Sequence, residues 1–397
     1  MKVVVAHNQY SSRQPSGENV VVAEEIAGLT AAGVTVLEFL RSSDEIRSLP
    51  LAERAALPLS PMYARRAQRE LDALLARERP DVLHLHNPYP LLSPWVVHTA
   101  HARGVPVVHT VHNFRQTCVN GLHFRDGAPC HDCVGRALPI PAVQHGCYRG
   151  SRAQSAIMAA ALTMHRGTWR RIDRMLALTP VIAEYVLSLG VPPDRVVVRP
   201  NSVPDPGRHS MTGDGFLVAG RLSVDKGIAI LLEAWRRHPD GALGSLRIAG
   251  DGPLAGLVRE QAGTRSDIEY LGALDHDGVV AAMRRSSVVV VPSVWDEVCP
   301  MVAIEAMANA RPVLGTYRGG LPWLVGATEE CPTPAGWLVE PEVDALAAAL
   351  SAARAEASNL SDAARHRYEE RFTPARGTAS LLAVYEDVVR SRDTKAA

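Results

Sequence analysis

The sequence predicts an α/β protein made of two domains with parallel sheets. Short runs rich in Val, Ile and Leu alternate with longer helix-like segments, which is the pattern of βαβ units and of sheets buried on both faces. The pattern pauses once, at residues 199–207, where three prolines favour an extended linker, and then it restarts. A length of 397 residues suits two or three domains, and a cleft between two such halves is the expected ligand site.

The N-terminal domain is expected to span residues 1–203, with a cysteine-rich insertion at residues 114–150. Its predicted strands are Lys2–Ala6, Val34–Phe39, Val82–Leu85 and Val105–Val111, and its amphipathic, helix-like stretches are Asn19–Ala31 and Ala64–Arg77. These elements are sufficient for a core of its own.

The C-terminal domain is expected to span residues 204–375. Its predicted strands are Phe216–Ala219, Leu246–Ala249, Ile268–Leu271, Val288–Val291 and Pro312–Gly315, with a helix at Ile228–Arg237. The helical character of Pro374–Arg390 predicts a last helix, and Ser391–Ala397 is expected to form a polar tail. Residues 376–397 are therefore set apart as a C-terminal helix and tail.

The composition excludes several classes of protein. Lys plus Arg and Asp plus Glu number 42 each, so the formal charge is zero, which disfavours nucleic acid as a partner. Hydrophobic residues make up 47% and charged residues 21%, which predicts a folded core rather than disorder. The first apolar run is too short for a secretory signal, and the longest later run is about half of a bilayer span. We expect a soluble, cytoplasmic protein, and peripheral contact with a membrane stays open.

The segment Ser293–Ala308 is the strongest candidate for chemistry. It follows the predicted strand Val288–Val291 and opens a helix at Pro300, whose fixed φ suits a first helical turn. The backbone N–H groups of Met301 and Val302 would then be free donors at the positive end of the helix, where a phosphate can bind.

Two carboxylates flank this helix start. Glu297 precedes it and Glu305 follows about two turns along, so the two lie about 12 Å apart at 1.5 Å per residue. This spacing suits two groups on opposite sides of a bound diphosphate, and it is too wide for a paired-carboxylate hydrolase, which needs about 5–9.5 Å. The alternative is a solvated acid before a helix and a buried glutamate with a structural partner. The spacing alone does not decide between them.

Two cations follow another predicted strand. Arg221 and Lys226 lie in the loop between Phe216–Ala219 and Ile228–Arg237, at the sheet edge where α/β proteins bind ligands. Arginine offers a fork for phosphate oxygens, and lysine offers a point charge. For two cations taken alone, an ordinary solvated loop is the simpler explanation.

Gly17 and His112 are candidates in the N-terminal domain. Gly17 follows the first strand, where the absence of a Cβ lets a ligand phosphate approach the backbone or simply permits a turn. His112 ends the strand Val105–Val111, where an imidazole can contact a sugar hydroxyl, shuttle a proton or serve a structural role. His84 and His86 occupy a similar strand end and are interpreted as structural.

Residues 118–147 hold four of the six cysteines, which are Cys118, Cys130, Cys133 and Cys147. A close pair with single cysteines on either side is typical of a structural zinc site with four thiolates. Free thiols are the second alternative and disulfides the third, because a cytosolic setting disfavours them. His123, His131 or His145 could replace one thiolate. Four thiolates leave no open position, so no catalytic metal is implied. Cys299 and Cys331 are expected to be isolated and buried.

Two common nucleotide-binding signatures are absent. There is no GxGxxG after the first strand and no GxxxxGK[ST], which disfavours a dehydrogenase and a P-loop NTPase. A set of motifs is present instead, in the order Ala219-Gly220-Arg221-Leu222 with Lys226-Gly227, Ala249-Gly250-Asp251-Gly252-Pro253, Leu271-Gly272, Pro292-Ser293, the Glu297-to-Glu305 spacing and Gly319-Gly320-Leu321-Pro322. Taken together, these motifs resemble those of the family 4 glycosyltransferases, which have the GT-B fold of two Rossmann-like domains facing a central cleft. The resemblance covers nearly the whole chain and is more specific in the C-terminal half.

The resemblance implies an enzyme that transfers a sugar, with retention of configuration, from a UDP- or GDP-sugar to a small-molecule, lipid or glycan acceptor. It implies that Arg221 and Lys226 neutralise the diphosphate, Glu297 holds donor sugar hydroxyls, Glu305 holds the ribose, Met301 and Val302 bind phosphate, Gly17 approaches the phosphates and His112 contacts the donor sugar. No metal is required at the reaction centre, because two cations and a helix end replace it.

Two positions depart from the family pattern. Pro300 stands where many relatives have glycine, so one backbone donor is missing, and Trp323 stands where an acidic residue is frequent. We expect Trp323 to be a packing residue. The alternative functions are a nucleotide-sugar epimerase of similar architecture, which needs a base at the sugar carbon, and a non-catalytic binding module whose zinc loop recruits a partner.

Overall fold

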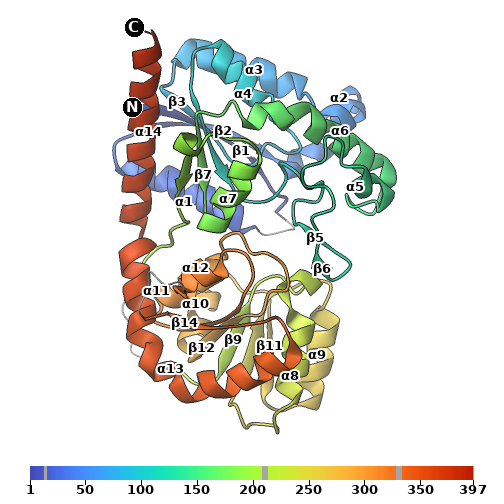
Figure 1. Ribbon diagram of the computed structural model, residues 1–397, viewed down its shortest axis with the longest axis vertical. Coiled ribbons are helices and arrows are strands. Elements are labelled where there is room, and N and C mark those ends of the chain that lie inside the picture. The colour runs from blue at the N-terminus through green and yellow to red at the C-terminus, as the bar shows by residue number, and fades with distance from the viewer. Residues whose placement is uncertain (13–15, 208–212, 328–332, 397) are drawn as a thin grey trace. The chain divides into compact units, whose positions relative to one another are not determined.

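The computed structural model describes residues 1–12, 16–207, 213–327 and 333–396, and the chain divides into two compact units (Figure 1). The first unit comprises residues 1–123, 130–200 and 375–397, and the second comprises residues 124–129 and 201–374. Each unit has its own six-stranded sheet, and every strand pair in the two sheets is parallel. The predicted α/β architecture with two parallel-sheet domains is confirmed.

The sheet of the first unit has the strand order β2-β1-β3-β4-β7-β8. Its strands are β1 (Lys2–Gln9), β2 (Thr35–Ser42), β3 (Val82–Leu85), β4 (Val107–Val111), β7 (Arg174–Ala177) and β8 (Val196–Val198). Its helices are α1 (Gly17–Ala31), α2 (Leu51–Ala56), α3 (Arg65–Glu78), α4 (Val96–Ala102), α5 (Ile140–Gln144), α6 (Arg152–Trp169), α7 (Pro180–Ser188) and most of α14 (Pro374–Ala396). The chain direction around the sheet reverses between β1 and β3, as in flavodoxin-like sheets, and ligands bind at such switch points.

The sheet of the second unit has the order β11-β10-β9-β12-β13-β14. Its strands are β9 (Phe216–Ala219), β10 (Leu246–Ala249), β11 (Ile268–Gly272), β12 (Val288–Val291), β13 (Val313–Thr316) and β14 (Gly336–Val339). Its helices are α8 (Ile228–Arg236), α9 (Ala255–Thr264), α10 (His276–Arg284), α11 (Met301–Ala308), α12 (Leu321–Val325) and α13 (Val343–Arg371). A two-stranded hairpin of β5 (Phe124–Arg125) and β6 (Ala128–Pro129) is antiparallel. The six-stranded order is that of a dinucleotide-binding Rossmann sheet, with its switch point between β9 and β12.

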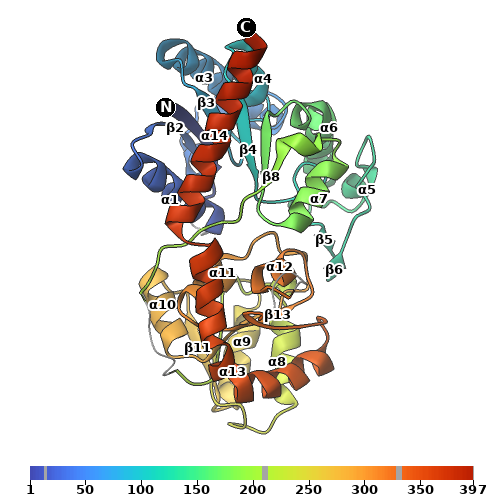
Figure 2. The same ribbon diagram turned by 60° about the vertical axis from the view of Figure 1, so that its left-hand side comes forward.

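Each strand predicted from the sequence overlaps an observed strand, whereas β7, β8 and β14 were not predicted. The longest helix, α13, was not predicted either. It packs against α8, α11 and β14 (Figures 1 and 2). Its buried positions are mostly alanines, among them Ala353 and Ala357, which give only a weak hydrophobic period.

The last helix, α14, folds onto the first unit, where Leu381, Tyr385 and Val388 join the same buried cluster as Val3 and Val5 (Figure 2). The helix continues to Ala396, beyond the predicted helical stretch that ends at Arg390. Within the described ranges, no helix has the length and apolar character needed to cross a membrane.

Candidate functional site

The switch point of the second sheet brings two distant motifs together. Strands β9 and β12 are neighbours, with Val289 opposite Leu217. Because they are parallel, the loops that follow both strands leave the same edge of the sheet, where open α/β sheets bind ligands. One loop carries Lys226, and the other carries Glu297.

Lys226 and Glu297 are direct partners. The Lys226 Nζ lies 2.7 Å from Glu297 Oε1. The same carboxylate oxygen accepts a hydrogen bond of 2.5 Å from the Ser293 hydroxyl, and the ammonium lies 5.0 Å from the centre of the Trp295 ring. Glu297 is only 3% exposed, whereas the lysine side chain is 29% exposed. The arrangement therefore holds a fixed positive charge at the surface of the sheet edge, supported by a buried carboxylate.

Backbone contacts fix the position of both side chains. The Val294 N–H donates to the Asp225 carbonyl at 3.0 Å, which ties the two loops together. Gly227 has φ +69°, and a Cβ at this position would lie 1.8 Å from the Pro292 carbonyl oxygen. The glycine predicted from the family motif is therefore required by close packing of two loops.

A second glycine motif supports the carboxylate from the other side. The Gly320 N–H donates to the Glu297 carbonyl at 2.6 Å. A Cβ on Gly319, which has φ +53°, would lie 2.2 Å from that carbonyl oxygen. The segment after β13 thus holds the backbone of Glu297.

Arg221 lies in the same loop as Lys226 but has a different environment. Its guanidinium Nη2 lies 2.9 Å from Asp225 Oδ2, and its side chain is 43% exposed. An exposed arginine with one acidic partner keeps donors for a phosphate, because its guanidinium carries five N–H groups.

The helix α11 begins where the sequence predicts. Pro300 is its N-cap residue rather than part of the first turn, and Met301 and Val302 are its first two residues, both half-buried. The first N–H groups of a helix have no partner within the helix, and they lie at its positive end. Their positions suit an anionic group.

Glu305, on the same helix, faces different surroundings. It lines a cavity of about 330 Å³ together with residues 203–206 and parts of α10, including His276 and Arg284. Burial raises the pKa of Glu305, and His276 opposes this shift. The cavity lining does not include Lys226 or Glu297. Of the two carboxylates of the predicted pair, Glu305 therefore lines this cavity and Glu297 does not.

In the first unit, Gly17 is the exposed first residue of α1, and the side chain of Ser16 caps that helix by accepting from the Glu18 N–H. His112 follows β4, and its Nε2 lies 2.9 Å from His86 Nδ1. Burial holds the pKa of His112 well below its ordinary value, so the ring is neutral at neutral pH.

The four cysteines 118, 130, 133 and 147 are half-buried and free of disulfides. Cys133 and Cys147 pack against one small core cluster. Burial raises the pKa of Cys133, and the charges of the other three thiols add to this shift. Within the part of the chain that the structure describes, however, no three of these sulfur atoms all lie within 4.8 Å of one another. Cys299 is buried as expected, and Cys331 lies outside the described residues.

Zinc binding by these cysteines stays a prediction, and it requires the thiols to turn toward one centre, since zinc–sulfur bonds are about 2.3 Å long. We expect elemental analysis of chain purified without chelator to find one zinc per chain, and the Cys130→Ser/Cys133→Ser variant to lose it. The matched control is Cys299→Ser, because this cysteine lies in the other unit. Zinc-free wild-type protein would contradict the prediction.

Some residues around the site were not predicted as functional. Ser293 and Trp295, which contact the Lys226–Glu297 pair, lie in the segment that the sequence singles out, but their roles depend on side-chain direction. Glu25 lies close to His86, and His86 lies close to His112. His86 was interpreted as structural, and Glu25 carries no motif, so only the packing of α1 on the sheet reveals this group.

Comparison with known proteins agrees with the fold. Residues 16–202 match the family model "Glycosyl transferase 4-like domain", and residues 213–355 match "Glycosyl transferases group 1". A sucrose-phosphate synthase from Thermosynechococcus elongatus has the same fold, with a TM-score of 0.71 at 20% identity over 98% of this chain and 99% of the other. Anabaena HepE, solved in complex with UDP-glucose, has a TM-score of 0.65 at 14% identity over 98% of this chain and 100% of the other.

Two curated relatives are similar in sequence over part of their length. The putative colanic acid biosynthesis glycosyltransferase WcaL of Salmonella typhimurium is 31% identical over 56% of this chain and 55% of its own. The 2-deoxystreptamine N-acetyl-D-glucosaminyltransferase of Streptomyces fradiae is 35% identical over 47% of this chain and 39% of its own. The matches therefore span about half of these relatives or less.

Two Rossmann-like parallel-sheet units, one with a lysine–glutamate pair at its switch point, define a protein of the GT-B glycosyltransferase fold. The chain belongs to the family 4 glycosyltransferases.

Proposed function

We propose that this protein transfers a sugar from a nucleotide-diphosphate donor to an acceptor hydroxyl, with retention of anomeric configuration. The observation that carries the proposal is the Lys226–Glu297 pair, 2.7 Å apart at the switch point between β9 and β12. A fixed cation at this edge, followed by the start of α11, suits a diphosphate whose negative charge grows as the bond to the sugar breaks.

Each polar group then has a role. Arg221 and Lys226 bind the diphosphate, and Lys226 exchanges part of its contact with Glu297 for a phosphate oxygen. The N–H groups of Met301 and Val302 bind further phosphate oxygens. The Glu297 carboxylate accepts hydrogen bonds from hydroxyls of the donor sugar.

The nucleoside occupies a second place in this proposal. Glu305 accepts from the ribose hydroxyls, and the cavity of about 330 Å³ that it lines takes the nucleoside. A buried carboxylate without hydrogen-bond donors is costly, so the burial of Glu305 favours hydrogen bonds from the ribose hydroxyls to its carboxylate. In the first unit, Gly17 approaches the phosphates, and His112 contacts the donor sugar.

The proposed chemistry uses no protein nucleophile. The acceptor oxygen attacks the anomeric carbon on the face from which the diphosphate leaves, and the leaving phosphate oxygen takes the proton of the acceptor hydroxyl. The bond between the anomeric carbon and that phosphate oxygen breaks as the new glycosidic bond forms. Catalysis then consists of positioning and of stabilising charge on the leaving group.

The relatives support the substrate classes without selecting one. The names of these relatives include colanic acid biosynthesis and a 2-deoxystreptamine N-acetyl-D-glucosaminyltransferase, which support a glycan or a small-molecule acceptor, and the solved structures include complexes with UDP and UDP-glucose. Together with the motif resemblance, they support our proposal of a UDP- or GDP-sugar donor. A lipid acceptor is consistent with the same chemistry.

A binding screen followed by product analysis tests the proposal. We expect thermal stabilisation of the full chain by UDP or GDP and their sugars, without a need for magnesium, and an α-linked product from an α-linked donor by NMR. A product of inverted configuration would reject retention, and a chain that binds no nucleotide diphosphate would reject transfer in favour of a binding module. Conversion of the donor to its epimer without any acceptor would identify an epimerase instead.

A further inference from the structure

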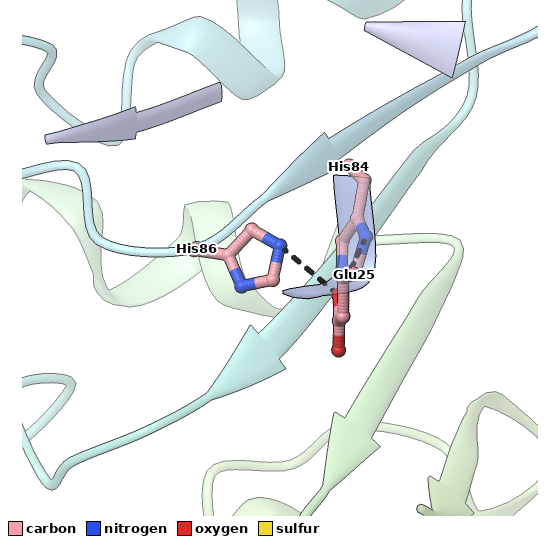
Figure 3. A group of neighbouring side chains, drawn as sticks. All are labelled: Glu25, His84 and His86. Atoms are coloured by element: carbon pink, nitrogen blue, oxygen red, sulfur yellow. Dashed lines mark ion pairs between the residues drawn. The ribbon is translucent and has the colours of Figure 1, made fainter. Parts of the chain in front are cut away.

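A buried polar network in the first unit leads from α1 to His112. Glu25 of α1 lies beside two histidines of the β3 end, and its Oε2 atom is 3.8 Å from His84 Nδ1 and 3.5 Å from His86 Nε2 (Figure 3). Glu25 is 8% exposed, and both histidines are fully buried. Potential ligand atoms of the three residues lie within 4.8 Å of one another, so a metal site is the first explanation to consider.

The surroundings disfavour a metal ion there. The Arg199 guanidinium lies 2.5 Å from Glu25 Oε1 and already supplies the positive charge that this carboxylate needs. Both ring nitrogens of His84 are hydrogen-bonded, Nδ1 with the Tyr385 hydroxyl at 2.7 Å and Nε2 with the Thr110 hydroxyl at 2.8 Å. A cation would have to break these bonds beside a buried arginine, which is electrostatically unfavourable.

His86 connects the carboxylate to His112. Its Nε2 lies 3.5 Å from Glu25 Oε2, and among the described residues neither atom has a hydrogen-bond partner. Its other nitrogen, Nδ1, lies 2.9 Å from His112 Nε2. The three groups therefore form a chain in the order Glu25, His86, His112.

Electrostatics selects one arrangement of protons in this chain. Burial holds the pKa of His86 well below its ordinary value, so the ring carries a single N–H. A lone pair on His86 Nε2 facing the carboxylate would be repulsive in the low dielectric of the interior, so the N–H lies on that side. His86 Nδ1 is then an acceptor, and His112 must donate to it from Nε2.

We propose that Glu25 and His86 are positioning residues that hold His112 as its Nε2–H tautomer and leave its Nδ1 as a hydrogen-bond acceptor. This inference rests on the proposed function, which gives His112 the contact with the donor sugar. A histidine fixed in this way accepts a hydrogen bond from a sugar hydroxyl at Nδ1 and cannot donate one from that atom. The network therefore selects the orientation of the hydroxyl at that contact.

The Glu25→Gln variant is expected to reverse the tautomer of His112. Arg199 donates to the Oε1 position of residue 25, so the side-chain oxygen of the new glutamine is expected to stay there. Its amide nitrogen then takes the Oε2 position, faces His86 Nε2 and donates to it. The His86 proton then moves to Nδ1, which donates to His112 Nε2, and His112 becomes the Nδ1–H tautomer. The matched control is Tyr385→Phe, which removes a hydroxyl from the same buried network without touching the chain from Glu25 to His112.

Long-range proton–nitrogen NMR spectra of the full chain with isotope-labelled histidine test this inference. The His112 signals are assigned by their loss in His112→Gln. We expect the Nε2–H pattern in the wild type and in Tyr385→Phe, and the Nδ1–H pattern in Glu25→Gln. An Nδ1–H pattern in the wild type, which needs no variant to fold, would overturn the proposal, as would an unchanged pattern in a folded Glu25→Gln protein.

Kinetics gives a second readout and separates two kinds of failure. We expect Glu25→Gln to lower kcat roughly 10- to 100-fold, by analogy with the loss of a residue that orients a metal-bound histidine, with little change in KM for the acceptor. The NMR result needs no turnover. Inactivity with every donor together with the expected tautomers would count against the proposed function alone, whereas activity with the wrong tautomers would count against the network alone.

Discussion

Replacing Lys226 with alanine is expected to lower kcat/KM for sugar transfer about 10²- to 10³-fold, the usual effect of removing one electrostatic stabiliser of a developing charge. The reason is that Lys226 is the cation fixed at the switch point by its contact with Glu297. The side chain is 29% exposed, so its removal opens no cavity in a core. Initial rates measured by mass spectrometry of the glycoside, with the melting temperature in parallel, check this expectation.

Controls separate the loss of charge from a loss of structure. Arg236→Ala removes an exposed cation of the neighbouring helix α8 that pairs with Glu233, and we expect it to retain full activity. The double variant Lys226→Met/Glu297→Gln removes both charges of the pair, so the buried carboxylate is not left without its cation. We expect it to melt like the wild type and to remain inactive. Normal turnover in Lys226→Ala and in a folded Glu297→Gln protein would count decisively against the proposed function.

Replacing Gly227 with alanine is expected to destabilise the protein by about 4 kcal/mol or more and to abolish binding of the nucleotide, because a backbone clash of this kind belongs to the severe class of substitutions. The new Cβ would meet the Pro292 carbonyl oxygen at 1.8 Å, and neither backbone can move without shifting β12 or the turn that carries Lys226. Thermal unfolding and calorimetric titration with the nucleotide measure the two effects.

A second glycine separates strain from the clash. Gly241 in the same unit also has a positive φ, +78°, but a Cβ there would have no atom within 4 Å. We expect Gly241→Ala to cost only about 1 to 2 kcal/mol, the price of a left-handed conformation for a residue with a side chain. Equal losses in the two variants would show that backbone strain alone, and not the contact between two loops, explains the requirement for Gly227.

The elements of the second unit were largely predictable from the sequence. Phe216–Ala219, Leu246–Ala249 and Val288–Val291 are strands with the predicted bounds. Each is a short run of mostly apolar residues between polar turns, as expected of a strand buried on both faces. Longer-range facts were not predictable in this way. The helix α13 buries alanines, which carry little periodic signal, and α14 packs onto the first unit although it follows the second in the sequence.

The candidate site shows the same division. The sequence singled out four charged residues that follow buried strands, because their spacing resembles the motif pattern of the family 4 glycosyltransferases. They are Arg221, Lys226, Glu297 and Glu305. The contact of Lys226 with Glu297 was not predictable, since 71 residues separate them. Glu25 was invisible in the sequence because an acidic residue on a helix usually faces water, and only the packing of α1 on its sheet shows that it lies beside His86.

The sequence by itself determined most of the sheet strands and the helices with a clear apolar period, because local periodicity and turn residues act over a few positions. It also determined the residue types available for chemistry at the strand ends. Only the tertiary structure decided the strand order, and therefore which strand ends are neighbours at a switch point. It also decided which polar atoms are buried together, as in the chain from Glu25 to His112, because burial depends on contacts between segments that are far apart in the sequence.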